Sequence, residues 1–186
     1  MKELSLNILD VTKNSVTAGA DRIDITLELS DDGWLRFSLK DNGCGMSEEV
    51  MRRVTDPFYT TRTTRKVGMG LPLLKLAAEQ TGGEMSITSS TEAGRSGTEI
   101  TATFDTKSID CMPVGDIVST ICILISGSPD VRFVFKDITP DGSVELDTLE
   151  LTQVLGEDIS LAEPEIVSWI KGYLCEQYEE RQSRSD

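Results

Sequence analysis

The sequence contains no histidine among its 186 residues. That absence excludes catalysis by a Ser-His-Asp or Cys-His set, and it excludes autophosphorylation on a histidine within this chain. The four cysteines, Cys44, Cys111, Cys122 and Cys175, lie far apart and form no C-x-x-C pair. A structural zinc site is therefore not expected.

Long hydrophobic runs are also missing. The most apolar stretch, residues 117–125, is interrupted by Ser119 and Thr120, and it is shorter than the ~20 residues that a membrane-spanning helix needs. The N-terminus is charged and leads into an amphipathic segment, which is unlike a signal peptide. We therefore expect a soluble, cytoplasmic protein with no membrane partner.

Positive charge is scarce, with 18 Lys and Arg against 32 Asp and Glu and a net charge of −14. A protein that binds a phosphate backbone nonspecifically needs the opposite sign, so nucleic acid is not expected as a partner. The acidity is uneven, with a net charge of −4 over residues 1–106 and −10 over residues 107–186. This difference predicts two parts, a domain over 1–106 and an acidic C-terminal α/β extension over 107–186.

The first part alternates helical and extended patterns. Apolar spacing predicts a helix over 3–18, and a second helical stretch is predicted over 71–78. Ser47, as an N-cap followed by two acidic residues, predicts a short helix. Period-two alternation predicts one hairpin from 23–29 and 35–39, and a second from 85–89 and 99–104. This order predicts an α+β fold, a two-layer sandwich with helices on one face of the sheet.

The second part is predicted to contain helices over 114–125 and near 149–155, and a final helix from Pro164. Strands are predicted at 131–136 and 143–147, and the polar tail 179–186 is expected to be frayed. An apolar stripe on the final helix suits either core packing, which we favour, or a docking surface. The stripe consists of Ile166, Ile170 and Leu174.

Two polar residues on the first predicted helix form a candidate metal pair. Asp10 and Asn14 are four residues apart, so their side chains project from one face one turn apart. Mg2+ takes oxygen ligands of this kind and keeps several waters. The alternative is an ordinary solvated helix face.

Two glycine-containing turns are candidates for a ligand site. Residues 41–46 follow a predicted strand and contain Asp41, Gly43, Gly45 and Met46, so a carboxylate lies beside backbone that can approach a ligand closely. The alternative is a simple Asn-Gly turn.

The second turn, 68–71, leads directly into a helix, as in a phosphate-binding helix N-terminus. Between the two turns, residues 59–66 combine hydroxyls with three cations and suit either a lid over phosphates or a solvated loop.

Together these motifs resemble the Bergerat-fold ATPases, which include DNA gyrase, the heat-shock chaperone, histidine kinases and MutL. The resemblance covers about residues 4–106. It is carried by five ordered motifs, at residues 10–14, 41–45, 56–61, 68–71 and 97–98. Only about three residues precede the first predicted helix, so the resemblance is to a stand-alone bacterial form without a dimerisation or phosphoacceptor domain.

The resemblance implies a role for each matching position, with ATP and Mg2+ as the bound groups. Asn14, with Asp10, would ligate Mg2+, Asp41 would bond the adenine amine, and Thr98 would support adenine. Asp10 stands where many members place a glutamate base, and it would be the catalytic residue. The other nucleotide-binding positions would be Gly43, Gly45, Met46, Phe58, Thr61, Arg62, Gly68, Met69, Gly70 and Leu71.

The predicted function is that of a Mg2+-ATP-binding regulatory protein that binds ATP or ADP and switches, or transfers phosphate to, a protein partner. Two alternatives stay open. The chain is a noncatalytic module whose shape ATP changes, or it is a serine/threonine kinase of the anti-sigma type in which Asp10 deprotonates a hydroxyl. A redox role for Cys44 is less favoured than a small residue tolerated in a turn.

Overall fold

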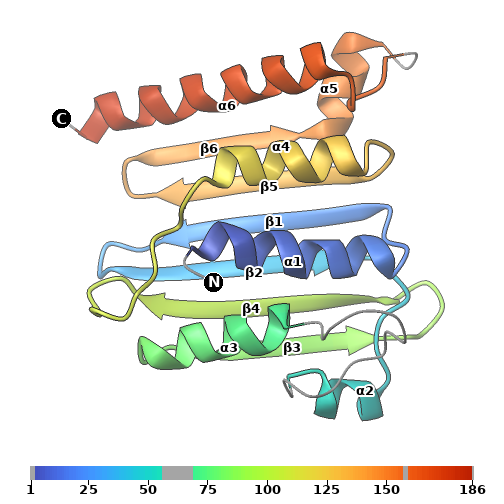
Figure 1. Cartoon of the computed structure of the whole chain (residues 1–186), viewed down its shortest axis with the longest axis vertical. Helices are drawn as coiled ribbons and strands as arrows, with labels where there is room; N and C mark the ends of the chain where they lie inside the picture. The colour runs from blue at the N-terminus through green and yellow to red at the C-terminus, as the bar shows by residue number, and fades with distance from the viewer. Residues whose placement is uncertain (1–2, 56–68, 157–158, 186) are drawn as a thin grey trace.

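The computed structural model describes residues 3–55, 69–156 and 159–185. Pairs of consecutive strands are separated by one or two helices along the chain (Figure 1). The helices are α1 (Leu4–Thr17), α2 (Glu48–Arg53), α3 (Gly70–Gln80), α4 (Ile117–Gly127), α5 (Thr148–Leu155) and α6 (Pro164–Ser185). The strands are β1 (Arg22–Leu29), β2 (Trp34–Asp41), β3 (Met85–Ser90), β4 (Gly97–Asp105), β5 (Arg132–Thr139) and β6 (Gly142–Asp147).

The six strands form one mixed sheet in the order β3-β4-β2-β1-β5-β6. The two predicted hairpins of the first part pair antiparallel, as does the hairpin of the second part. The two parts meet where β5 pairs parallel with β1, with Arg22 opposite Arg132. The predicted α+β fold is confirmed, and the strands of the extension belong to the same sheet as those of the first part.

The core lies between the sheet and the helices α1, α3 and α4, which cover one face of it (Figure 1). Ile23, Ile25 and Leu27 of β1 are completely buried, while Asp24 and Thr26 between them are not. This alternation places the apolar side chains against the helices and the polar ones on the opposite face. None of the helices in the described ranges is both long enough and apolar enough to cross a membrane.

The segment between the two parts caps the start of α1. The N–H groups of Leu4 and Ser5 donate to the carbonyls of Pro113 (3.0 Å) and Val114 (2.8 Å), which satisfies two donors that a helix start leaves unpaired. The prediction that α4 begins at residue 114 was therefore wrong. That helix starts at Ile117.

The side chain of Asp116 is the cap of α4. Its carboxylate accepts a bond from the N–H of Ser119 at 2.9 Å, and a residue that caps a helix in this way precedes its first turn.

The final helix does not fray where the sequence predicted. It continues to Ser185, because the Arg181 guanidinium donates to Asp137 Oδ1 at 3.0 Å and the Tyr178 hydroxyl donates to Asp137 Oδ2 at 2.6 Å. Burial and the neighbouring carboxylate raise the pKa of Tyr178 well above its usual value. The core-packing interpretation of the stripe is confirmed for Ile170 and Leu174, which are fully buried.

The bonds from Tyr178 and Arg181 to Asp137 can be tested for their contribution to the stability of the end of α6. We expect Tyr178→Phe to lower the free energy of unfolding by about 1–2 kcal/mol, because a buried carboxylate loses one of its donors. Urea unfolding followed by circular dichroism measures the change. Tyr173→Phe is the matched control, since the Tyr173 hydroxyl makes no hydrogen bond within the described part of the chain. Equal losses in the two variants would contradict the assignment.

Candidate functional site

Asp41, the last residue of β2, is the centre of the candidate site. It is 8% exposed. Its Oδ1 accepts bonds from the N–H groups of Gly43 (3.0 Å) and Thr98 (3.2 Å), and its Oδ2 accepts one from the Ser15 hydroxyl (2.5 Å). An ionised carboxylate offers about four acceptor positions. Among the residues that the structure describes, three donors use these positions, so the fixed carboxylate keeps capacity for one more.

The backbone around Asp41 is packed too closely for side chains. A Cβ on Gly97 would lie 2.1 Å from the Asp41 carbonyl oxygen, and a Cβ on Gly45 would lie 1.9 Å from the Ser90 carbonyl oxygen. Both glycines also have positive φ, at 144° and 69°, a region that L side chains rarely adopt. The two turns therefore need glycine at these positions for packing as well as for conformation.

A hydroxyl pair ties these turns together. The Ser89 hydroxyl accepts a bond from the Met46 N–H (2.8 Å), donates to the Gly97 carbonyl (2.8 Å) and lies 2.8 Å from the Thr98 hydroxyl. Because Ser89 has one proton and gives it to Gly97, the Thr98 hydroxyl is the donor between the two. The turn at 43–46 is thus held against the start of β4.

The start of α3 lies against α1 beside Asp10. A Cβ on Gly70 would lie 3.3 Å from the Cβ of Asp10. Asp10 is exposed and Asn14 is half-buried, while Met69 is exposed and Leu71 is buried. The first N–H groups of a helix have no partner within it and favour an anion. An acidic side chain and a helix start therefore lie side by side, and Asn14 follows one turn further along α1.

Phe58, Thr61, Arg62 and Gly68 lie outside the described residues, as does the predicted lid at 59–66. Contacts link several of the other predicted positions, joining Asp41 to Gly43 and Thr98 and bringing Gly70 against Asp10.

Sequence reasoning missed Ser15 and Ser89, which hold Asp41 and the glycine turns. Ser15 stood in the apolar stripe of the first helix, and a buried hydroxyl in an apolar stripe is a signal that it has a polar partner. Ser89 lay in a strand with no signal beyond its position.

Comparison with protein families identifies the domain. A model described as the histidine kinase-, DNA gyrase B- and HSP90-like ATPase matches residues 1–108, which is more than half of the chain. This chain belongs to that ATPase family. The predicted superfamily is confirmed.

Curated relatives of this ATPase domain include sensor kinases. Over 91 residues the chain is 35% identical to sporulation kinase E of Bacillus subtilis, covering 48% of this chain and 12% of that protein. Over 98 residues it is 32% identical to the tetrathionate sensor histidine kinase TtrS of Salmonella typhimurium, covering 52% of this chain and 16% of that protein. The chain thus spans less than a fifth of the length of either relative.

Solved structures share the fold of this ATPase-family chain over a longer stretch. The N-terminal domain of a DNA repair protein has a TM-score of 0.58 at 16% identity, covering 79% of this chain and 53% of that one. The Aquifex aeolicus MutL ATPase domain complexed with ADP has a TM-score of 0.50 at 15% identity, covering 83% and 69%. Such coverage exceeds residues 1–108, so the shared fold includes part of the extension.

The glycine at position 45 can be tested against a matched position. We expect Gly45→Ala to lower the free energy of unfolding by about 3 kcal/mol or more, because the added methyl would clash with the Ser90 carbonyl oxygen of the backbone. Gly94→Ala should cost only about 1 kcal/mol. Gly94 has a similar φ of 78°, but it has open space around it. Denaturant unfolding measures both variants, and similar losses would show that conformation alone requires glycine.

Proposed function

We propose that residues 1–106 form the Mg2+-ATP-binding domain of a cytoplasmic regulatory protein that acts through a protein partner. The observation that carries this proposal is the buried Asp41 carboxylate, fixed by Ser15, Gly43 and Thr98 and left with one acceptor position. Membership of the ATPase family supports it.

The surroundings of Asp41 suit an adenine ring. The exocyclic amine of adenine is a donor, and a fixed carboxylate is the complementary acceptor. Gly45 lets backbone stand where a side chain would otherwise fill the space. The Thr98 hydroxyl donates to Ser89, and its lone pairs remain for a second donor or a bridging water.

The other end of the region suits phosphates and their metal ion. The start of α3 offers backbone N–H groups, and Asp10 and Asn14 offer oxygens one turn apart on α1. When bound, Mg2+ would neutralise phosphate charge. Asp10 has two possible roles, as a metal ligand or as a base. They compete, because a carboxylate that coordinates a cation is a weaker proton acceptor.

Asp41→Asn separates nucleotide recognition from folding. The Asn oxygen can still accept from Gly43 and Thr98, and its amide can donate to Ser15. The Asn NH2 group then faces the adenine amine in place of a carboxylate oxygen, and two donors cannot form a hydrogen bond. ATP affinity should therefore fall about 100-fold or more. Isothermal calorimetry with ATP and ADP, with and without Mg2+, measures this loss.

Asp24→Asn is the control for that titration. Asp24 lies on the neighbouring strand and pairs with Arg22 at the surface, so its substitution removes the same charge without touching the site. Full ATP affinity in Asp41→Asn, with the wild-type fold, would refute the adenine assignment.

The second candidate function is a noncatalytic module whose surface changes when ATP binds. The position of Asp10 beside the start of α3 supports the catalytic version, a kinase or ATPase, because a carboxylate next to a proposed phosphate-binding helix start is within reach of a reacting water or hydroxyl. In the kinase version Asp10 would take the proton of a partner hydroxyl.

Asp10→Asn distinguishes the two. If the chain is catalytic, release of labelled phosphate should fall about 100-fold or more while ATP affinity changes little. Rapid quench with excess enzyme measures a single turnover, and calorimetry measures affinity. Absence of turnover in the unaltered chain, both alone and with candidate partner proteins present, together with normal ATP binding, would favour the noncatalytic module.

A further inference from the structure

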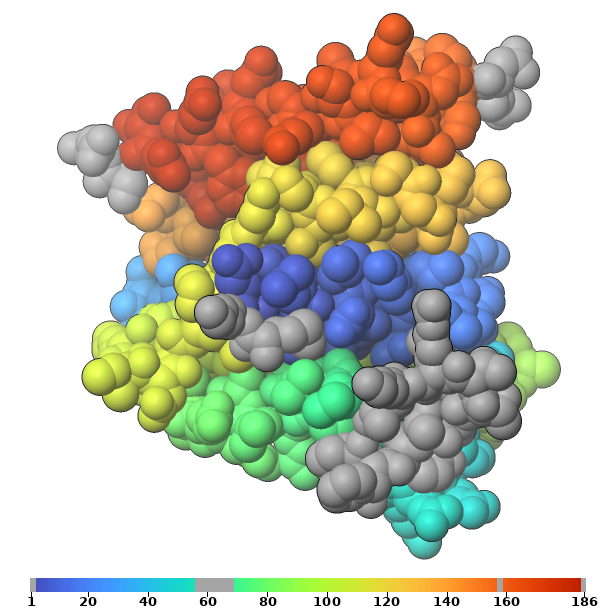
Figure 2. All heavy atoms as spheres, in the orientation of Figure 1, coloured from blue at the N-terminus to red at the C-terminus, as the bar shows by residue number. Residues whose placement is uncertain are grey.

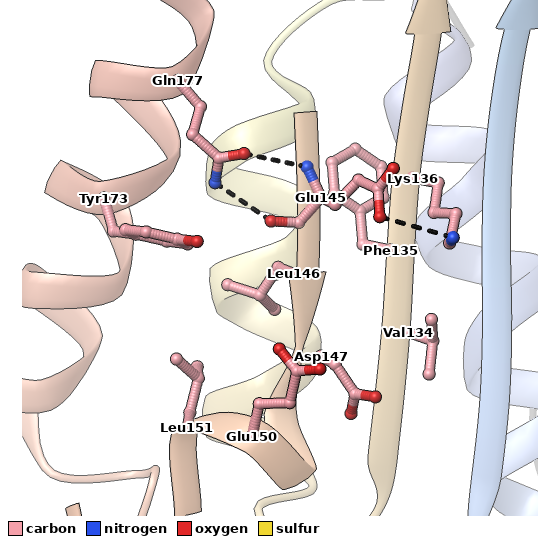
Figure 3. A pocket seen from close by; sticks show the side chains of 10 residues that line it. All are labelled: Val134, Phe135, Lys136, Glu145, Leu146, Asp147, Glu150, Leu151, Tyr173 and Gln177. Carbon is pink, nitrogen blue, oxygen red and sulfur yellow. Dashed lines mark hydrogen bonds and ion pairs between the residues drawn. The ribbon is translucent and has the colours of Figure 1, made fainter. Parts of the chain in front are cut away.

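A hollow lies away from Asp41, between α6 and the last two strands (Figure 3). Its volume is about 250 Å3. It is lined by Val134, Phe135, Lys136, Glu145, Leu146, Asp147, Glu150, Leu151, Tyr173 and Gln177. Its outward strand residues, such as Glu145 and Asp147, belong to the sheet face opposite α1 and α4.

The walls of this hollow are held in place. The Gln177 amide clasps the edge of β6, since its oxygen accepts from the Glu145 N–H and its nitrogen donates to the Glu145 carbonyl, both at 3.0 Å (Figure 3). This bond pair satisfies backbone groups at the exposed edge of the sheet. It also fixes α6, and Tyr173 with it, at the side of the hollow.

Most charges at the hollow already have partners. Asp147 pairs with Arg132 at 2.6 Å, and that guanidinium holds the pKa of Asp147 below its usual value. Lys136 pairs with Glu145 at 3.3 Å. Glu150, by contrast, makes no hydrogen bond or ion pair with the described residues. The charge of Glu150 acts on the Arg132 guanidinium, but the described residues place no donor on its oxygens, which remain acceptors for a further cation.

Tyr173 is the aromatic residue of α6 that lines the hollow, and Trp169 lies behind it on the same helix. Tyr173 stacks on Trp169 with ring centroids 5.5 Å apart and planes 8° from parallel. The two rings are 38% and 48% exposed. The Tyr173 ring and the Glu150 carboxylate line one hollow, and this pair is complementary to a planar cation, because a guanidinium stacks on a ring face and bonds a carboxylate with two N–H groups.

We propose that this hollow binds an arginine side chain of a protein partner, with the guanidinium between Glu150 and Tyr173. Charge complementarity supports a basic segment, since residues 107–186 carry a net charge of −10. The site uses no residue of the candidate nucleotide-binding region, so it stands whether or not the chain binds ATP.

The test titrates the full, nucleotide-free chain with the peptide acetyl-Gly-Gly-Arg-Gly-Gly-amide, followed by nitrogen-15 NMR. We expect saturable shifts confined to α5, α6 and β6, including the indole N–H of Trp169. The same peptide with citrulline in place of arginine keeps the shape and loses the charge, and it should produce no shifts. The lysine peptide should bind roughly fivefold more weakly, because an ammonium is not planar and neither stacks on a ring nor forms two parallel hydrogen bonds to one carboxylate.

Two variants test the residues. Glu150→Gln and Tyr173→Leu should each lower the affinity for the arginine peptide about fivefold or more. Glu163→Gln, an exposed position ahead of α6, removes the same charge as the Glu150 variant and should leave binding unchanged. Circular dichroism checks that each variant is folded.

The proposal would be overturned by an absence of shifts at millimolar arginine peptide, or by equal binding of the citrulline or lysine peptide. It would also be overturned if Glu150→Gln and Glu163→Gln lowered the affinity for the arginine peptide equally, because that would indicate attraction by net charge alone.

Discussion

The parallel pairing of β1 with β5 is the contact on which the arrangement of the whole chain depends. β1 is hydrogen-bonded to β2 on one side and to β5 on the other, so it joins the ATPase-family part to the acidic extension in one sheet. Its side chains Ile23, Ile25 and Leu27 are fully buried beneath the helices. Without this pairing, the extension would leave the edge of β1 open and α4 without its place beside α1.

That continuity relates the two sites to each other. The candidate nucleotide-binding region lies where α1 meets α3, and the hollow proposed to bind arginine lies between α6 and the strands β5 and β6 (Figures 1 and 3). α1 contacts both α3 and α4, and α4 contacts α6. In the space-filling view the helices form successive bands, from α3 through α1 and α4 to α6 (Figure 2). A partner seated on α6 would thus be connected to the nucleotide region by packed helices on one sheet.

Local patterns predicted most of the elements and the motifs. The alternation of Ile23, Ile25 and Leu27 predicted a strand, and the chain from Asp41 to Met46 predicted a ligand turn after a strand. The supporting hydroxyls of Ser15 and Ser89 were not predicted, because they bond Asp41 and Met46, which lie 26 and 43 residues away. The end of α6 was also missed. A polar tail predicts fraying, and the bonds that Tyr178 and Arg181 make to the distant Asp137 are visible only in the structure.

The sequence by itself determined the family, the hairpins and the residue types at the candidate site, because these depend on short-range spacing and on the special geometry of glycine. Only the tertiary structure decided that β5 lies beside β1, that Asp41 keeps one free acceptor position, and that Tyr173 and Glu150 share a hollow. Each of these depends on contacts between residues distant in the chain, and no local pattern of hydrophobicity encodes which distant strand or side chain becomes the neighbour.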